Sequence, residues 1–271
     1  MGGREAHPTL MDAAGARPSD GPPQARPPLA SYTRAMHAAA PTRPTTRAAA
    51  ALALCASISA ALLLGLALLA PAPATATTPA DIKPPIFKKL IAFGDTRRAQ
   101  MADYSKRHYR QHTYLLTDPK VVVLHHTAGA QWQSAWWTFQ NNTAYNNEKP
   151  GVSAHFIIGK DGTIYQCVPL YLRARHAIGM NWTSFGIEFV QEPRSGKDGH
   201  WMDQQILNRP EQARAGLQLV RYLQLRYGIT DRNIVGHATA NDSPYFKDYT
   251  GIKNAAGDWY AAEVRKFRAR L

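Results

Sequence analysis

The sequence predicts an α/β domain built on a mixed β-sheet that carries helices on its faces. The segment "VVVLHH" (121–126) is short, apolar and β-branched, which is typical of a buried strand. The segment "HFIIGKDGTIYQCV" (155–168) predicts a hairpin, because Asp-Gly is a strong turn signal. The segment "PEQARAGLQLVRYLQLRY" (210–227) repeats apolar residues every three or four positions and predicts a helix. Strands interrupted by helices and a hairpin favour a mixed sheet.

Further elements fit the same class. The segments "FGIEFV" (185–190) and "NIVGH" (233–237) predict strands, and "QSAWWTFQNN" (133–142) predicts a helix. The helix over 210–227 has a proline in its first turn and is followed by glycine, the usual stop signal. We expect a single folded domain over about residues 85–271, large enough to bury a substantial core.

The N-terminal part predicts targeting rather than folded structure. Residues 1–47 hold almost no large apolar side chains, so we expect a disordered extension, and a true start at Met36 would give a signal of ordinary length. Residues 48–76 contain the uncharged run Ala48–Ala70, preceded by arginine and followed by small residues, as in a secretory signal peptide. The run is also long enough for an uncleaved membrane anchor. Either form exports the domain, to the periplasm, the cell envelope or the outside.

Charge and cysteine content narrow the partners. The chain has 32 Lys and Arg against 19 Asp and Glu, a formal net charge of +13. An exported basic protein suits an anionic polymer or surface such as a cell wall. The sequence contains no basic run interleaved with aromatic residues, so no nucleic-acid partner is predicted. Only Cys167 remains after signal removal, so we expect no internal disulfide and a buried thiol. We also expect a monomer, and contact with a membrane only through the N-terminal segment if it is not cleaved.

Three polar residues stand where the core strands end. His125 follows "VVVL", His237 follows "NIVG", and Glu188 lies inside "FGIEFV". Burying such groups costs free energy unless they are paired or bind a metal. A catalytic zinc site takes three protein ligands, which His125, His237 and an acid from "NDSPYFKDYTG" (241–251) could supply. Glu188 could then accept a proton, and Lys247 could stabilise a developing oxyanion.

Four segments together resemble a known family. "VVVLHHTAG", "VSAHFIIGKDGTIYQCVP", "RHAIGMNWTSFGIEFV" and "NIVGHATANDSPYFKDYTG" follow the order and spacing of the zinc-dependent N-acetylmuramoyl-L-alanine amidases, the type-2 amidase family that includes peptidoglycan recognition proteins. The resemblance covers about residues 115–255. It implies a central mixed sheet flanked by helices, Zn²⁺ in a surface groove, and cleavage of the amide between the muramic-acid lactyl group and L-alanine of peptidoglycan.

The resemblance also implies roles for individual residues. His125 and His237 match zinc ligands of the family, and Glu188 matches its general base. We expect three further residues at the substrate-binding part of the site, namely His155, His176 and Asn181. Consecutive strand residues point to opposite faces, so His126 is expected to be structural while His125 binds the metal.

Two departures from the family pattern bear on the site. Relatives often carry Lys, any residue, then Asp or Cys as the third ligand, whereas Lys247 and Asp248 are adjacent in this chain. Either Asp248 is the ligand with Lys247 displaced, or the loop is rebuilt and Asp242 serves; we expect Asp248. Some members place a catalytic tyrosine where this chain has Ala154, which leaves Glu188 as the proton-transfer residue.

Two other functions compete with this interpretation. A non-catalytic peptidoglycan-binding module is known among the recognition proteins, and loss of a metal ligand would indicate it. A glycosidase would need two carboxylates flanking one bond, and among the candidates only Glu188 is placed for that.

Overall fold

The computed structural model describes residues 77–271. The predicted N-terminal extension and the signal or anchor segment, residues 1–76, lie outside the described residues. Within residues 77–271, no helix has the length and apolar character that crossing a membrane requires.

A six-stranded sheet forms the centre of the domain, in the order β1-β4-β3-β5-β2-β6. Its strands are β1 (Phe87–Lys88), β2 (Val121–His126), β3 (Phe156–Ile158), β4 (Ile164–Gln166), β5 (Ser184–Phe189) and β6 (Ile234–Gly236). The pairs β3·β5, β5·β2 and β2·β6 are parallel, whereas β3 and β4 form the antiparallel hairpin. The prediction of a mixed sheet is confirmed.

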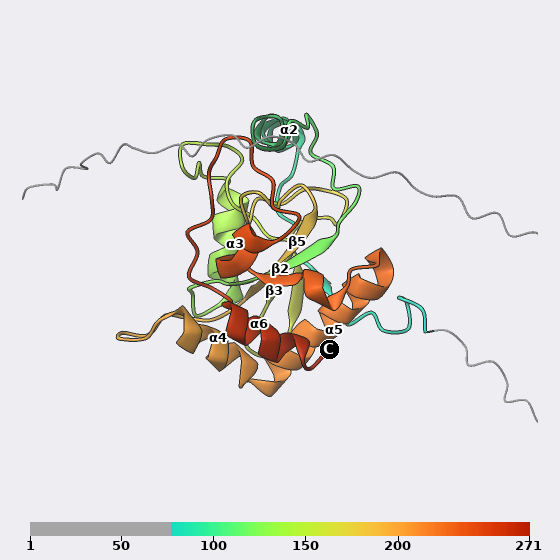
Figure 1. Cartoon of the computed structure of the whole chain (residues 1–271), viewed down its shortest axis with the longest axis vertical. Coiled ribbons are helices and arrows are strands. Elements are labelled where there is room, and N and C mark those ends of the chain that lie inside the picture. The colour runs from blue at the N-terminus through green and yellow to red at the C-terminus, as the bar shows by residue number, and fades with distance from the viewer. Residues whose placement is uncertain (1–76) are drawn as a thin grey trace, which may run out of the picture. The chain divides into compact units, whose positions relative to one another are not determined.

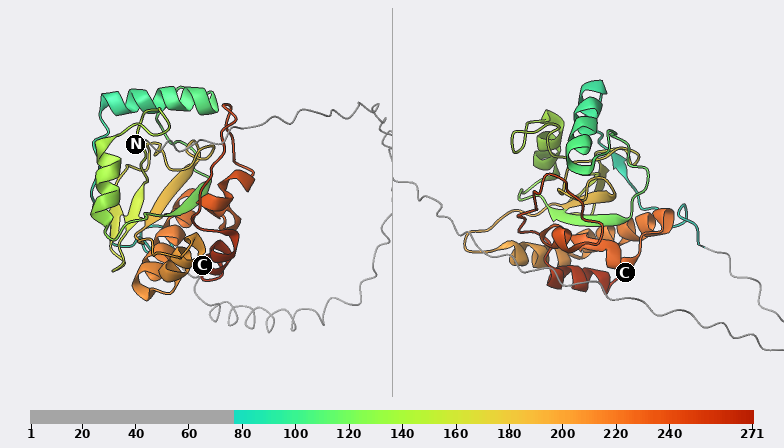
Figure 2. Two further views of the ribbon diagram at one scale, coloured as in Figure 1. Left: turned by 90° about the vertical axis from the view of Figure 1, so that its left-hand side faces the viewer. Right: turned by 45° about the horizontal axis from the view of Figure 1, so that its top comes forward.

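Helices cover both faces of this sheet (Figures 1 and 2). They are α2 (Asp95–Tyr109), α3 (Trp132–Asn141), α4 (Gly199–Leu207), α5 (Pro210–Tyr227) and α6 (Ala261–Arg268), with short 3₁₀ turns η1 (Asp231–Asn233) and η2 (His237–Asp242). Helices α4, α5 and α6 share one apolar core with the sheet. Helices α2 and α3 share a second core with its other face.

The strongest local signals of the sequence set the bounds of two elements. Helix α5 covers residues 210–227 as predicted, with a proline in its first turn. Gly228 ends it with a φ of 68°, a left-handed conformation that glycine adopts without a steric penalty. Strand β2 covers the predicted residues 121–126 and is buried along almost its whole length.

The core on the α4–α6 side is anchored by aromatic contacts. Phe189, at the end of β5, is fully buried, with its ring centroid 5.1 Å from that of Trp259 and 6.2 Å from that of Phe267. Trp259 is also fully buried. The segment before α6 is therefore packed directly onto the central strands, which matters for the site described below.

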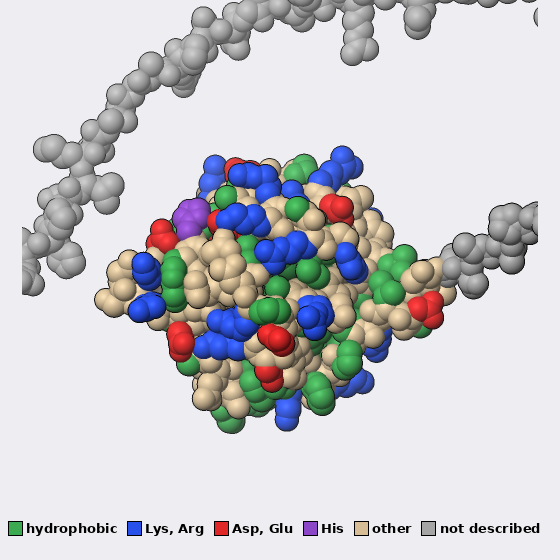
Figure 3. Space-filling view, turned by 90° about the horizontal axis from the view of Figure 1, so that it is seen from below, with side chains coloured by type: hydrophobic (Ala, Val, Ile, Leu, Met, Phe, Trp, Pro, Cys, Tyr) green, Lys and Arg blue, Asp and Glu red, His purple; other side chains and the backbone are tan. Residues whose placement is uncertain are grey.

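The outer surface on the α4–α6 side is rich in basic side chains. Figure 3 shows this side of the molecule, where Lys and Arg side chains are scattered over the face and outnumber Asp and Glu. Several of these arginines donate to main-chain carbonyls; Arg268, for example, binds the carbonyl oxygens of Arg232 and Ile234.

Replacing Phe189 by alanine should lower the free energy of unfolding by about 3–5 kcal/mol, because it leaves a cavity beneath Trp259 and Phe267. Urea unfolding followed by far-UV circular dichroism measures the change. Leu225→Ala is the matched control, since Leu225 is 44% exposed on α5 and its truncation should cost less than about 0.5 kcal/mol. Equal losses in the two variants would contradict this account of the core.

Candidate active site

Parallel pairing of the central strands brings three polar residues to one edge of the sheet. In the register of β2 and β5, His125 lies opposite Glu188. In the register of β2 and β6, Leu124 lies opposite Gly236, so the next residue, His237, falls beside His125. The ring centroids of the two histidines are 4.4 Å apart. Carboxyl ends of parallel strands are where α/β proteins commonly build their sites.

Asp258 completes this group from a later part of the chain. Its Oδ1 lies 3.0 Å from Nδ1 of His237, and its Oδ2 lies 3.4 Å from Nδ1 of His125. Each of the three residues offers a ligand atom, and these atoms all lie within 4.8 Å of one another. Asp258 and His125 are buried, and His237 is partly buried.

Main-chain contacts hold the segment that carries Asp258 against the strand ends. The indole Nε1 of Trp259 donates to the carbonyl oxygen of His125 at 3.1 Å. The amide of Tyr260 donates to Oδ2 of Asp203, a buried residue of α4, at 3.1 Å. Gly236 lets the segment approach, because a Cβ there would lie only 1.6 Å from the Trp259 carbonyl oxygen. The position of Asp258 is thus fixed from both sides.

The hydrogen bonds of Asn254 fix the tautomer of His237. The Nδ2 group of Asn254 donates to the carbonyl oxygen of Ile178 and to Oδ1 of Asn241, both at 2.9 Å. Its Oδ1 therefore faces Nε2 of His237, at 3.2 Å, and can only accept a hydrogen bond. We infer that Nε2 of His237 carries the hydrogen and that Nδ1 presents a lone pair towards Asp258.

A second chain of hydrogen bonds fixes the tautomer of His125. The hydroxyl of Ser184 donates to the Met180 carbonyl oxygen at 2.7 Å, so it accepts from Nε2 of His176, 3.3 Å away. Nδ1 of His176 then accepts from Nε2 of His125 at 3.1 Å. Burial lowers the pKa of His125 to about 4, which keeps the ring neutral at physiological pH. Its Nδ1 also presents a lone pair to Asp258.

These residues fit a divalent cation. Two imidazole lone pairs and one carboxylate converge, and the other ring nitrogens are occupied by outer hydrogen bonds, as is usual for metal-binding histidines. Without a cation, three acceptor atoms would face one another in a partly buried site. Two histidines, one carboxylate and an open side form a typical donor set for a catalytic Zn²⁺.

Glu188 and this group of three line one cavity of about 500 Å³. Oε2 of Glu188 is buried and has no hydrogen-bond partner among residues 77–271. Burial, assisted by the negative charge of Asp258, raises the pKa of Glu188 from 4.5 to about 8. A carboxyl group with such a pKa can both take up and release a proton near neutral pH. The other walls come from Tyr104 of α2 and from the segments 145–153 and 252–257.

A comparison with protein families identifies the kind of domain that carries this site. The model of the N-acetylmuramoyl-L-alanine amidase family matches residues 115–248. This part of the chain belongs to this family. The strands that carry His125, Glu188 and His237 all lie inside the match, whereas α2 and the segment with Asp258 lie outside it.

Several solved structures of this kind are similar to the chain. LysC, an N-acetylmuramoyl-L-alanine amidase from Clostridium intestinale URNW, is 22% identical with a TM-score of 0.44, covering 69% of this chain and 97% of LysC. The Ph2119 endolysin of a Thermus scotoductus MAT2119 bacteriophage is 19% identical with a TM-score of 0.40, covering 68% and 99%. A mutant endolysin from Bacillus subtilis is 23% identical with a TM-score of 0.38, covering 57% and 84%. No curated protein matches the chain significantly. These similarities are too low to carry an argument about activity.

The structure places the acid expected as third ligand elsewhere. Asp248 turns away from the two histidines, and its fully buried Oδ2 accepts from Nδ1 of His108 on α2 at 2.6 Å. The alternative, Asp242, is exposed at the end of η2. The loop is rebuilt relative to the family pattern, as the adjacency of Lys and Asp indicated, but the acid at the group of three is Asp258.

Lys247 is likewise not at the cavity. Its Nζ lies 5.6 Å from the ring centroid of Trp182 and 5.1 Å from that of Tyr249, and it is not among the lining residues. Its amide donates to the Gly179 carbonyl oxygen at 3.0 Å. The aromatic rings hold this ammonium away from Glu188, so the geometry does not support the expected role at an oxyanion.

The three residues expected to bind substrate have different surroundings. His176 lines the cavity and contacts His125, as described above. Asn181 is buried and accepts the amides of His176 and Ala177 through Oδ1, at 2.9 and 2.8 Å, so it positions His176. His155 is fully buried: its Nε2 donates to the Leu172 carbonyl oxygen, and its Nδ1 accepts from the Gly186 amide. Both positions exclude direct contact with a substrate.

His126 lines the same cavity but does not belong to the group of three. Neither ring nitrogen has a hydrogen-bond partner among the described residues, and Nε2 is 3.8 Å from Oδ1 of Asp203. Burial lowers the pKa of His126. The other expected buried residue, Cys167, is fully buried, and burial raises the pKa of its thiol to about 12. This thiol is therefore not a nucleophile at neutral pH.

The sequence did not indicate Asp258, because it lies beyond the segment 241–251 that was expected to supply the third metal ligand. The sequence feature that could have indicated Asp258 is weak. Asp258 is the sole acid of residues 249–258, and the apolar Trp259 follows it just before an amphipathic stretch. A ligand so placed depends on the packing of Trp259 beneath the strand ends, which no local pattern reports.

Asp258→Asn should weaken Zn²⁺ binding by at least about 100-fold, because it removes one of three donor groups. Asp248→Asn should leave the affinity within about threefold, since Asp248 contacts His108 instead. Competition with a chromophoric chelator measures both. A normal affinity in Asp258→Asn, or a large loss confined to Asp248→Asn, would reject the assignment of Asp258.

Glu188→Gln should make the metal-free protein less sensitive to alkaline pH. The raised pKa of Glu188 means that the folded state holds a proton that the unfolded state has lost between pH 4.5 and about 8. This carboxyl group therefore lowers stability as pH rises through that window, and glutamine does not. Thermal unfolding in a chelator should show that the variant gains roughly 2–5 °C on the wild type between pH 5 and pH 9. Parallel curves for the two proteins would contradict this prediction.

Proposed function

We propose that this protein hydrolyses the amide bond between N-acetylmuramic acid and L-alanine of the peptidoglycan stem peptide, with Zn²⁺ as cofactor. The observation that carries the proposal is the convergence of His125, His237 and Asp258 beside the unpartnered carboxyl group of Glu188. Membership of the amidase family supports the bond that we assign. A non-catalytic binding module would have no need for a complete donor set next to an isolated carboxyl group.

His125, His237 and Asp258 would hold the zinc ion. When bound, Zn²⁺ supplies Lewis acidity, which polarises a carbonyl group and makes a water molecule more acidic. His176 and Asn254 hold the two imidazoles in the tautomers that leave Nδ1 free. The protein thereby presents its donor atoms without rearrangement.

Glu188 is assigned the proton transfer. Its carboxylate accepts the proton of the attacking water and then returns it to the leaving amine of L-alanine. Burial raises the pKa of this carboxyl group, which favours its acid form as the donor to the leaving amine, and the positive charge of a bound Zn²⁺ would favour the carboxylate that accepts the first proton.

We also propose that the domain acts outside the cytoplasm. The support is the uncharged run Ala48–Ala70 with arginines before it and small residues after it. The mature N-terminus, read by mass spectrometry on protein from the culture medium and from membranes, distinguishes a cleaved signal from an anchor.

Digestion of purified peptidoglycan tests the function. We expect new free amino groups on L-alanine, loss of activity on zinc removal and recovery when Zn²⁺ is restored. Glu188→Gln should bind zinc normally but lower kcat by about 100- to 10,000-fold, because it cannot accept a proton.

Other outcomes have distinct meanings. New reducing sugars without free amino groups would indicate a glycosidase. Binding to peptidoglycan with no product in the presence of zinc would indicate a recognition module. Activity that survives complete removal of metal would reject the mechanism.

A further inference from the structure

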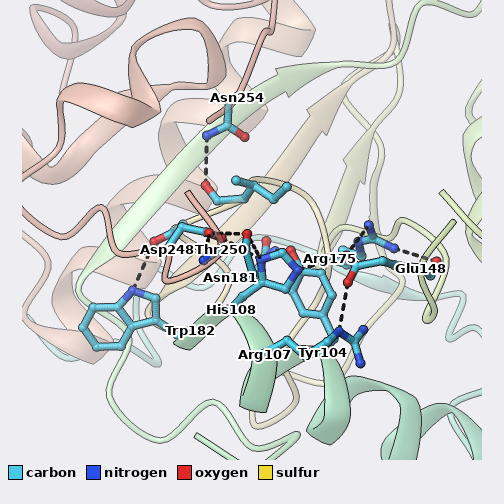
Figure 4. Close-up of polar contacts among 12 residues, drawn as sticks. Tyr104, Arg107, His108, Glu148, Arg175, Asn181, Trp182, Asp248, Thr250 and Asn254 are labelled. Atoms are coloured by element: carbon cyan, nitrogen blue, oxygen red, sulfur yellow. Dashed lines mark hydrogen bonds and ion pairs between the residues drawn. The ribbon is translucent and has the colours of Figure 1, made fainter. Parts of the chain in front are cut away.

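Asp248 and its partner His108 form the centre of a buried polar cluster that the proposed chemistry does not use (Figure 4). His108 lies near the end of α2, and its side chain is completely buried. Its Nδ1 is 2.6 Å from Oδ2 of Asp248, and its Nε2 is 2.9 Å from Oε2 of Glu148. The three residues come from segments far apart in the chain, and two of them lie outside or at the end of the family match.

The remaining contacts of both carboxylates show that they act as acceptors. Oδ1 of Asp248 accepts from the amide and the hydroxyl of Thr250, at 2.8 and 2.6 Å. Oε1 of Glu148 accepts from Nε of Arg107 at 2.9 Å, and Nη2 of Arg175 lies 3.5 Å from Oε2. Each ring nitrogen of His108 lies within hydrogen-bond distance of one of these carboxylates, so a single side chain links the two acids.

Aromatic rings enclose His108. The ring of Tyr104 stacks on it with centroids 4.1 Å apart, and Tyr109 contacts it from the same helix. Arg107 and Arg175 contact Glu148 as well, so this carboxylate is held by three partners. Burial would raise the pKa of Glu148, but the hydrogen bonds from His108 and Arg107 outweigh it and lower this pKa.

Each carboxylate belongs to a segment that forms a wall of the cavity. Glu148 closes a tight turn with Tyr145 through two main-chain hydrogen bonds, and Tyr145 lines the cavity while remaining 55% exposed. On the other side, Asp248 and Thr250 precede Ile252, which lines the cavity and is 42% exposed. The cavity thus has an apolar rim made of two segments, and His108 contacts both.

The segment 250–254 is anchored at its two ends by different partners. Asp248 and Thr250 tie its beginning to His108, and the Tyr249 amide donates to the His108 carbonyl oxygen at 2.8 Å. Asn254 ties its end to His237. Loss of the His108 side chain would loosen the first end, which would keep only the main-chain bond of Tyr249, and would leave the second end and the metal-binding group in place.

We propose that His108 is a positioning residue for the substrate groove: clamped between Glu148 and Asp248, it sets the spacing of the two rim segments that carry Tyr145 and Ile252. The proposal rests on the proposed function, because it assigns the cavity as the place where the stem peptide or its sugar binds. It gives Asp248 a role in substrate binding in place of metal binding.

His108→Gln in the full-length protein tests this, because both donors of an amide lie on one nitrogen, whereas Asp248 and Glu148 contact two different nitrogens of the ring. With a soluble muramoyl tetrapeptide as substrate, we expect KM to rise about tenfold while kcat stays within about twofold. Zn²⁺ affinity should be unchanged. Hydrogen exchange should show faster exchange of the Tyr249 and Thr250 amides than in the wild type.

Two control variants separate the role of His108 from general effects of mutating this part of the protein. Ser105→Ala removes a buried hydroxyl of α2 that has no partner among the described residues, and His112→Ala removes an exposed histidine paired with Asp103. Neither should change KM or the exchange of Tyr249. Tyr145→Ala, at the exposed rim, should also raise KM, and its effect should not add to that of His108→Gln if both act through the same wall.

The outcomes are distinguishable from failure of the proposed function. If the wild type has no amidase activity, the proposed function falls. Hydrogen exchange of the Tyr249 and Thr250 amides would still show whether His108 holds their segment in place. Unchanged exchange in His108→Gln, or an unchanged KM with faster exchange, would overturn the proposal. A fall in kcat together with zinc loss would instead place His108 among the residues that support the metal.

Discussion

Parallel pairing of β2 with β5 on one side and β6 on the other is the constraint on which the rest of the molecule depends. The register sets His125 opposite Glu188 and brings His237 beside it, so a buried carboxyl group and two imidazoles share one edge without any loop having to order them. A one-residue slip of either strand would turn these side chains to the opposite face of the sheet. The two apolar cores, which bury both faces, hold this register in place.

The polar part of the site is organised outward from that edge. The imidazoles are fixed by hydrogen bonds that end on main-chain groups or on an oriented amide, through His176 and Ser184 on one side and Asn254 on the other. Asp258 is fixed in turn by Asp203 and by Trp259, whose indole binds the His125 carbonyl oxygen. Each group that could contact a metal therefore has its geometry set by a neighbour that does not.

The sequence predicted the parts of this arrangement that have a local cause. The apolar run of β2, the hairpin turn and the spacing within α5 are properties of a few adjacent residues, and the polar residues at strand ends followed from them. The position of Asp258 has no such local cause, because it depends on the packing of Trp259 against Phe189 of β5, a residue far earlier in the chain. Helix α2 was also missed: it alternates charged and apolar residues with little amphipathic character, and its buried His108 looks in sequence like one more surface histidine.

The spread of the metal-binding group along the chain has a consequence for biosynthesis. Its members stand at positions 125, 237 and 258, and the last is held in place by the packing of Trp259 against Phe189 and against Phe267 of the final helix. A nascent chain that lacks its last segment cannot complete the group. Retention of a metal at these three residues would therefore require that the last segment has docked, so that an ion would be captured by a finished fold.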